Sequence, residues 1–218
     1  MTAHKIAGVL GLLLLLAWPV LAQAENAASA VPAAPETPET QDTPDTVVVQ
    51  VNETLLGTMR DAESLGFQGR YDRLAPVFTA AFQFPYMARV AAGSYWRDLG
   101  PEQREQLAGA FAHMSVATYA ARFDGYSGQS FKVVETVEQP RGGALVRNRL
   151  IKGDGEVVAI DYLLREFDGR WRIVDVFLDG TISEIATKRS EYTSILHRDG
   201  FAGLLARISS KTAELAAQ

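Results

Sequence analysis

The stretch IDYLLREFDGRWRIVDVFLDG, residues 160–180, contains the clearest β-hairpin of this chain. It predicts two apolar strands joined by Asp168-Gly169, because Asp-Gly favours a two-residue hairpin turn. Asp161 and Asp175 nevertheless lie inside the two strands. A buried carboxylate is costly unless other groups satisfy it or a reaction uses it. The two aspartates could therefore be the acid and base of an enzyme, or they could serve the fold of a protein that only binds.

The two-residue turn also predicts which way the side chains of the hairpin point. In the register that it sets, Asp161 lies opposite Val176 and Asp175 lies opposite Tyr162. Directly opposed residues share a face, and neighbours along a strand alternate, so the aspartates are expected on opposite faces. A three-residue loop would reverse this parity and bring both carboxylates to one face. The favoured register excludes a carboxylate dyad.

Both faces of the predicted hairpin are largely apolar. A sheet that is apolar on both sides must be covered twice, by helices or by a ligand, although a two-sided core without a cavity is equally consistent with the pattern. One face carries Val158, Ile160, Tyr162, Leu164, Trp171, Ile173 and Phe177, and the other carries Val157, Leu163, Val174, Val176 and Leu178 with Asp161 and Arg165.

The remaining chain predicts helices, then strands, then helices. Helical periodicity runs from Val47 to about Leu65, and the strongest helix starts at residues 100–102, Gly-Pro-Glu. Four strand candidates follow, FKVVETVEQ, ALVRNRLIK, EVVAIDYLLREF and RWRIVDVFLDG, with short glycine-containing connections. Helix returns at Thr181 and is interrupted at Asp199-Gly200. The fold class expected is α+β, with a four-stranded antiparallel meander sheet packed with several helices around an apolar pocket.

The N-terminus has the pattern of a secretory signal peptide over residues 1–24. His4 and Lys5 precede an almost unbroken apolar run over residues 6–20, and Ala-Gln-Ala at residues 22–24 fits a cleavage site. The apolar run is shorter than the roughly 20 residues that span a bilayer. An exported, periplasmic protein is expected, and a retained membrane anchor is the alternative.

Residues 25–46 form a predicted disordered linker that is rich in proline, alanine and acidic residues, and residues 47–218 form a single domain. Without the signal and linker the chain holds 21 acidic and 20 basic residues, so no basic surplus favours nucleic acid. The absence of cysteine excludes disulfides, a thiolate nucleophile and a cysteine zinc site. The histidines outside the signal, His113 and His197, are separate in sequence, so we expect no catalytic residue, no metal and no cofactor.

Several short motifs occur in an order that resembles the MlaC family, also called the toluene-tolerance family. They lie in RVAAGSYWRDLGPEQREQLAGAF, residues 89–111, and in residues 162–208. The first stretch has an aromatic pair, Tyr95-Trp96, before Pro-Glu-Gln-Arg-Glu, and the second has Asp179-Gly180 before a helix with Arg189 and Tyr192. Residues 116–133, VATYAARFDGYSGQSFKV, resemble most the branch associated with hopanoid biosynthesis, HpnM.

The resemblance implies a monomeric periplasmic carrier with a deep apolar pocket for acyl chains. Its implied partners are phospholipid or hopanoid, an inner-membrane ABC transporter complex and an outer-membrane lipoprotein, with no nucleic acid. Three alternatives remain: a hopanoid-associated export component anchored at the membrane, an enzyme in which an aspartate moves a proton on a steroid-like lipid, and a scaffold without ligand. In the carrier, Asp175 would bond the Tyr162 hydroxyl, and Asp161 would pair with Arg165 or Arg172.

The lipid pocket is expected between the sheet and the helices around residues 82–123. A tail-shaped pocket cannot bury phosphate or hydroxyl groups without partners, so a small polar mouth should receive the headgroup. The expected lipid-binding residues are Phe82, Phe84, Met87, Tyr95 and Trp96 before the long helix, Phe111, Met114 and Tyr119 within it, and Tyr162, Leu164, Ile173 and Phe177 on one face of the sheet.

Overall fold

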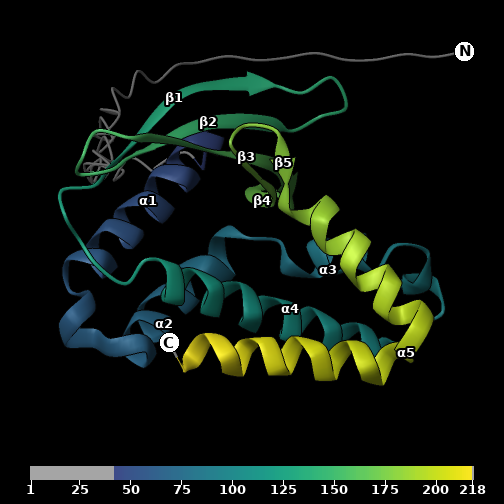
Figure 1. The fold of residues 1–218 in the computed structure, drawn as a ribbon. Coiled ribbons are helices and arrows are strands. Elements are labelled where there is room, and N and C mark those ends of the chain that lie inside the picture. Colours follow the sequence, from purple (N-terminus) through teal and green to yellow (C-terminus); the bar gives the residue numbers. More distant parts are fainter. Residues whose placement is uncertain (1–41, 218) are drawn as a thin grey trace, which may run out of the picture. The chain divides into compact units, whose positions relative to one another are not determined.

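A computed structural model describes residues 42–217 of the chain, so the predicted signal peptide and nearly all of the predicted linker lie outside the described residues. The described part is an α+β fold in which helices precede and follow an antiparallel sheet (Figure 1). Its elements are α1 (Pro44–Arg60), α2 (Ala62–Ala81), α3 (Phe84–Ala92), the 3₁₀ helix η1 (Gly93–Arg97), α4 (Pro101–Arg122), β1 (Ser130–Glu138), β2 (Ala144–Ile151), β3 (Val157–Phe167), β4 (Arg170–Leu178), β5 (Ile182–Ser183) and α5 (Glu184–Ala216).

The first helix begins three residues before the predicted domain start at Val47. Thr43 caps it, since its side chain accepts from the backbone N–H of Thr46 at 3.4 Å while the Thr46 hydroxyl accepts from the Thr43 N–H at 3.0 Å. Pro44 occupies the first turn, where a missing N–H costs nothing. The helix ends at Arg60, earlier than the predicted Leu65, because the backbone leaves helical geometry at Asp61.

The sheet is an antiparallel meander with strand order β1-β2-β3-β4-β5. The four predicted strands are confirmed, and the two-residue β5 adds a fifth. Because Ile182 and Ser183 pair with β4, the chain stays extended past Thr181, where the helix was predicted to begin. The helix α5 starts instead at Glu184, with the Ser183 hydroxyl accepting from the Ala186 N–H at 2.9 Å.

The two-residue turn of the β3–β4 hairpin is confirmed. Asp168 and Gly169 both have positive φ, 50° and 73°, as a type I′ turn requires. Next to the turn, Leu164 lies opposite Ile173, as the predicted register has it. The predicted register therefore holds for the half of the hairpin nearest the turn.

Beyond that half, a β-bulge at Val174 shifts the register by one residue. Asp161 lies opposite Phe177 rather than Val176, and Asp175 lies opposite Leu163 rather than Tyr162. The predicted separation of the aspartates is therefore wrong, because one extra residue in β4 brings both carboxylates to the same face of the sheet.

The bulge also decides which side chains join the core. The face of the sheet that packs against the helices, called the inner face below, carries Val158, Ile160, Tyr162, Leu164, Trp171, Ile173, Val176 and Leu178. Phe177 was predicted on this face but lies on the other one, the outer face, and does not join the core. The outer-face side chains Leu145 and Leu163 stay half-buried, so the second cover expected for this sheet is not found within residues 42–217.

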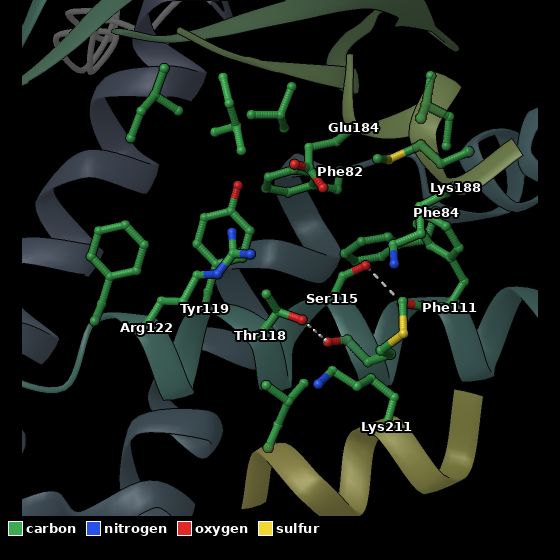
Figure 2. A pocket seen from close by; sticks show the side chains of 18 residues that line it. Phe82, Phe84, Phe111, Ser115, Thr118, Tyr119, Arg122, Glu184, Lys188 and Lys211 are labelled. Atoms are coloured by element: carbon green, nitrogen blue, oxygen red, sulfur yellow. Dashed lines mark hydrogen bonds between the residues drawn. The ribbon is translucent and has the colours of Figure 1, made fainter. Parts of the chain in front are cut away.

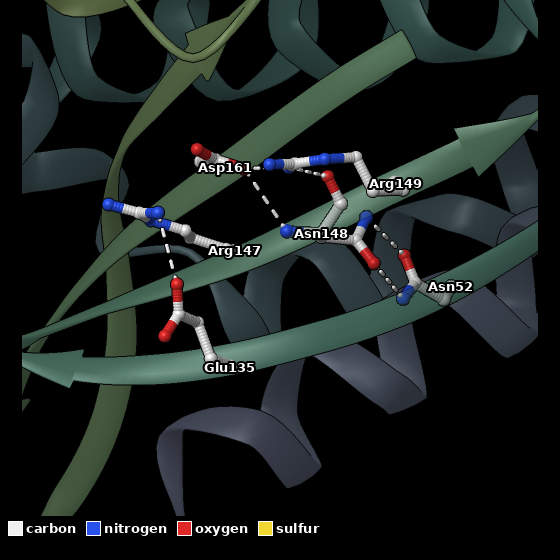
Figure 3. Close-up of polar contacts among 6 residues, drawn as sticks. All are labelled: Asn52, Glu135, Arg147, Asn148, Arg149 and Asp161. Carbon is white, nitrogen blue, oxygen red and sulfur yellow. Dashed lines mark hydrogen bonds and ion pairs between the residues drawn. The ribbon is translucent and has the colours of Figure 1, made fainter. Parts of the chain in front are cut away.

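The helices α1 and α5 differ in how they are joined to the sheet. Beneath β1 and β2, α1 is joined to the sheet by a buried amide pair, in which Asn52 and Asn148 donate to each other at 2.9 and 3.3 Å (Figures 1 and 3). The helix α5 leaves the sheet edge and then turns sharply at Gly200, whose φ of 70° and ψ of −170° are not helical. Its second half returns along α4 (Figure 1), which confirms the predicted interruption at Asp199-Gly200. In residues 42–217 no helix combines the length and apolarity needed to cross a bilayer.

Candidate functional site

A cavity of about 490 Å³ lies between the inner face of the sheet and the helices α3, α4 and α5. Figure 2 shows its lining side chains, which are mostly apolar at the sheet and include charged groups on α4 and α5. The lining residues are Phe82, Phe84, Met87, Phe111, Met114, Ser115, Thr118, Tyr119, Arg122, Phe123, Ile160, Val176, Leu178, Glu184, Ile185, Lys188, Lys211 and Leu215.

One wall of the cavity is a row of aromatic rings. Phe82 stacks on Phe84 with ring centroids 5.4 Å apart, and Phe84 meets Phe111 at 6.3 Å. Phe82 stands in the short segment between α2 and α3, which is tied to β4 by the Gln83 N–H donating to the Ile173 carbonyl at 2.9 Å. This backbone bridge fixes the aromatic row against the sheet, so the wall is preformed.

The helix α4 supplies the floor through residues at helical spacing. Ser115 and Thr118 follow Phe111 by four and seven positions, so all three side chains share one stripe. The hydroxyls of Ser115 and Thr118 donate to the Phe111 and Met114 carbonyls at 2.8 Å each (Figure 2). Because these donors are already used by the helix backbone, the floor offers a ligand little hydrogen bonding.

Four charged side chains line the cavity, two of them exposed and two half-buried, and are called the mouth below: Arg122, Glu184, Lys188 and Lys211. Lys188 pairs with Glu191 at 3.0 Å, and Lys211 pairs with Glu214 at 3.2 Å. Arg122 and Glu184 make no ion pair or side-chain hydrogen bond with any other described residue. The mouth carries three cations and one anion, while the walls behind it are apolar.

Two tyrosine hydroxyls lie behind the mouth. Burial raises the pKa of Tyr119 well above its usual value, the charge of Glu184 raises it further, and the charge of Arg122 lowers it. Burial also raises the pKa of Tyr162, and the neighbouring Tyr119 acts in the same direction. The Tyr162 hydroxyl is buried, and within residues 42–217 it has no hydrogen-bond partner.

Asp175 joins the sheet to α5. Its carboxylate accepts from the backbone N–H of Val176 at 2.8 Å, the N–H of Ile185 at 3.0 Å and the Ser183 hydroxyl at 2.6 Å. Burial raises its pKa above the usual 3.8, and these three bonds oppose the rise. The predicted bond to Tyr162 is wrong, because the bulge turns Asp175 to the outer face. This carboxylate satisfies the backbone at the start of a helix.

Asp161 has a different set of partners (Figure 3). It accepts from the Asn148 N–H at 3.1 Å and from the Arg149 guanidinium at 2.7 Å. The predicted pairing with Arg165 or Arg172 is wrong, since the neighbouring strand β2 supplies the cation. Both aspartates are thus engaged in structural bonds, and neither lines the cavity. Residues 42–217 hold no cluster of three or more histidine, aspartate and glutamate side chains that could bind a metal.

The structure brings together six of the twelve residues predicted for the pocket: Phe82, Phe84, Met87, Phe111, Met114 and Tyr119. Tyr162, Leu164 and Ile173 lie on the inner face but are enclosed by other side chains and do not line the cavity. Tyr95 and Trp96 lie in η1, away from the lining, where the Tyr95 hydroxyl is 3.3 Å from His197 Nδ1. Phe177 lies on the outer face.

The lining residues that sequence reasoning missed come from α4 and the residue after it, from β3 and β4, and from both halves of α5. Ser115, Thr118 and Arg122 continue the stripe of Phe111 along α4, so helical spacing alone could have found them. Lys211 and Leu215 come from the second half of α5, which reaches the cavity only because the helix turns back at Gly200. No local pattern signals that return.

Two comparisons bear on this arrangement. The family model described as "MlaC protein" matches residues 49–210. The fold is similar to a solved structure of the phospholipid-binding protein from Ralstonia solanacearum in complex with a phospholipid, with a TM-score of 0.70 and 21% identity. That alignment covers 79% of this chain and 98% of the other. The resemblance predicted from the motifs in residues 89–111 and 162–208 is confirmed, while neither comparison tests the hopanoid branch.

Proposed function

This chain belongs to the MlaC family, and from that premise we propose that it is a periplasmic carrier of phospholipid. It takes up a lipid with the acyl chains in the cavity and the headgroup at the mouth. In this proposal it is the soluble component of an Mla-type ABC transport system. It exchanges lipid with an inner-membrane transporter complex and an outer-membrane lipoprotein.

The observation that carries the proposal is the cavity, with its apolar walls and charged mouth. Its volume of about 490 Å³ lies within the roughly 300–1,000 Å³ of small-molecule pockets. Each methylene group transferred from water to such walls contributes about 0.8 kcal/mol, so an acyl chain can be held by burial alone. A phosphate would lie beside Arg122, since it needs a cationic partner if it is to leave bulk water.

Phospholipid is favoured over hopanoid as cargo by the chemistry of the mouth. A hydroxylated polycyclic lipid brings no charge to partner Arg122, whereas a phosphodiester does. The protein of similar fold from Ralstonia solanacearum is described in complex with a phospholipid, which supports the same choice. Hopanoid, with a membrane-anchored export role, stays the second candidate through the likeness of residues 116–133 to the hopanoid branch.

A binding role rather than catalysis is supported by the state of the two aspartates. Asp161 is held by Arg149 and the Asn148 N–H, and Asp175 is held by three donors. An acid–base residue must reach the substrate proton within hydrogen-bonding distance, directly or through one water. Because neither carboxylate lines the cavity, a lipid held there would reach neither one.

Native mass spectrometry of the protein purified from its own host tests the carrier function. We expect a bound lipid of one class, and extraction identifies it as phospholipid or hopanoid. An emptied apolar cavity leaves its walls without contacts, so lipid should survive purification under non-denaturing conditions. Purified protein without any lipid would contradict the proposal.

An obstructing substitution assigns the bound lipid to this cavity. Thr118→Trp places a large side chain in the cavity from the floor, without displacing a large buried residue, and should abolish lipid retention. Thr187→Trp is the matched control, because Thr187 lies in α5, is exposed and makes the same hydroxyl bond to the carbonyl four residues earlier. Equal lipid content in the two variants would place the lipid elsewhere.

Export has its own test. The signal pattern predicts a mature chain that begins at Glu25 in the periplasm. N-terminal sequencing of the native protein should give Glu25. An intact Met1 on membrane-bound protein would favour the anchored form.

A further inference from the structure

The four charged residues of the mouth differ in whether they already have a partner. Lys188 and Lys211 each pair with a glutamate of α5, Glu191 and Glu214, three positions along the helix. Arg122 and Glu184 carry opposite charges, line the same cavity, and pair neither with each other nor with any other charged side chain in residues 42–217. The mouth therefore holds one uncompensated cation and one uncompensated anion.

These two residues come from different elements and face the same tyrosine. Arg122 stands in the last turn of α4, and Glu184 is the first residue of α5. Figure 2 shows Arg122 beside the ring of Tyr119 and Glu184 beside the ring of Phe82. The charges of both act on the Tyr119 hydroxyl in opposite directions, so both lie near it. Because Arg122 and Glu184 line one cavity without pairing with each other, a ligand in that cavity can bring an opposite charge to each.

The helix dipole explains why Arg122 is a cation and Glu184 an anion, but it does not explain why both side chains line the cavity. A cation is favourable in the last turn of a helix, and an anion is favourable in the first turn. The same preference is met at Arg60 in the last turn of α1 and at Glu102 in the first turn of α4, and neither of these lines the cavity. Arg60 and Glu102 thus provide matched controls, since they share the dipole contribution and lack the position at the mouth.

We propose that Arg122 and Glu184 together recognise a zwitterionic phospholipid headgroup, with Arg122 binding the phosphate and Glu184 binding the ammonium group. This inference rests on the proposed lipid-carrying function and adds the headgroup class. A purely anionic headgroup would satisfy Arg122 but would bring its charge close to the Glu184 carboxylate. A hydroxylated polycyclic lipid would leave both side chains without an opposite charge. An amine-bearing phospholipid satisfies both at once.

The test is lipid competition on the full chain. The protein is stripped of lipid, incubated with vesicles of equimolar phosphatidylethanolamine and phosphatidylglycerol, re-isolated, and its two lipids are quantified by mass spectrometry. Wild-type protein should load phosphatidylethanolamine in excess. Glu184→Gln should lower the ratio of phosphatidylethanolamine to phosphatidylglycerol about fivefold, the size expected for a partly exposed ion pair. Glu184→Lys should reverse the preference.

A second variant and two controls separate recognition from general effects. Arg122→Gln should reduce the loading of both lipids, because both carry the phosphate, and should change their ratio less than Glu184→Gln does. Glu102→Gln and Arg60→Gln alter the same helix-end charges outside the cavity and should leave loading and ratio at the wild-type values. Thermal melting of every variant shows whether a change in loading follows a loss of folded protein.

The possible failures are distinguishable. If lipid is loaded but Glu184→Gln leaves the ratio unchanged, the headgroup assignment is overturned and the carrier function stands. If Glu102→Gln shifts the ratio as much as Glu184→Gln, net charge rather than the mouth sets the preference, and the assignment is again overturned. If stripped and native protein hold no lipid of either class, both the assignment and the carrier function fail.

Discussion

The two halves of the β3–β4 hairpin have similar apolar sequences but different surroundings. Near the turn, Leu164 and Ile173 on the inner face are fully buried in a closed core. Beyond the bulge, Ile160, Val176 and Leu178 on the same face line the cavity. An apolar side chain that is buried on the inner face shows that water is excluded, and it does not show whether protein or a ligand excludes it.

The difference follows from the segments that cover each half. The segment between α2 and α3 lies directly on the closed half, through the Phe82–Ile173 bridge and the bond from the Gln83 N–H to the Ile173 carbonyl. At the open half, α5 leaves the sheet at Glu184, where Asp175 holds its first turn. The isolated bridge among residues 42–217 is made to Ile173 and not to Val176, and Val176 borders the cavity instead.

The largest expected effect compares truncations in the two halves. Ile173→Ala should cost about 2–5 kcal/mol of unfolding free energy, because it leaves an enclosed void in the closed core. Val176→Ala should cost about 1.5 kcal/mol, since it removes two methyl groups from a wall that already borders a cavity. Urea denaturation measures both. Equal losses would show that the two halves are packed alike.

A larger side chain in the closed half should lower the stability of the fold through strain, and it should not displace the lipid. Leu164→Trp should cost about 1–3 kcal/mol through overpacking, while the lipid content per folded molecule stays at the wild-type level. Thr118→Trp should show the opposite pattern, with lipid lost and smaller destabilisation. Melting temperature and lipid content, measured on the same samples, test this. Loss of lipid from the Leu164 variant would place Leu164 at the cavity.

The pH dependence of stability tests the contribution of Asp175, which lies on the outer face just beyond the bulge. Burial raises its pKa above 3.8, so folding favours the protonated carboxyl. Its contribution should be fully present below about pH 3.8 and should be lost as the pH rises through the raised folded pKa. Relative to Asp175→Asn, the wild type should thus become less stable from about pH 3 to pH 7. Denaturation of both proteins across this range measures the difference. If the wild type instead gained stability relative to Asp175→Asn as the pH rises, the folded-state pKa of Asp175 would be lowered and not raised.

The smallest expected effect concerns Tyr162, at the boundary between the two halves. Its buried hydroxyl makes no hydrogen bond within the described chain, so Tyr162→Phe should be neutral or should stabilise the protein by up to about 1 kcal/mol. Tyr192→Phe is the control, because that hydroxyl donates to the Met114 sulfur at 3.8 Å and its loss should cost a little. Destabilisation by Tyr162→Phe above 1 kcal/mol would reveal a bond to Tyr119 or to a ligand.

The prediction of the hairpin was right at its turn and wrong beyond it. Asp168-Gly169 needs positive φ at both positions, a local preference that the residues themselves carry. The bulge at Val174 has no such marker, since Val-Asp-Val continues the alternation of apolar and polar residues without a glycine. One undetected bulge residue was enough to move Phe177 to the outer face and to change the residue that lies opposite each aspartate.

The sequence by itself determined the order of helices and strands, the antiparallel meander and the interruption at Gly200. Each of these depends on a period of a few residues or on the φ preference of a single turn, so neighbours along the chain suffice. Only the tertiary structure decided that Arg149 partners Asp161, that Asp175 anchors α5, and that Lys211 reaches the mouth. Those contacts join residues far apart in sequence, and they follow from how the helices and the bulged sheet fill space together.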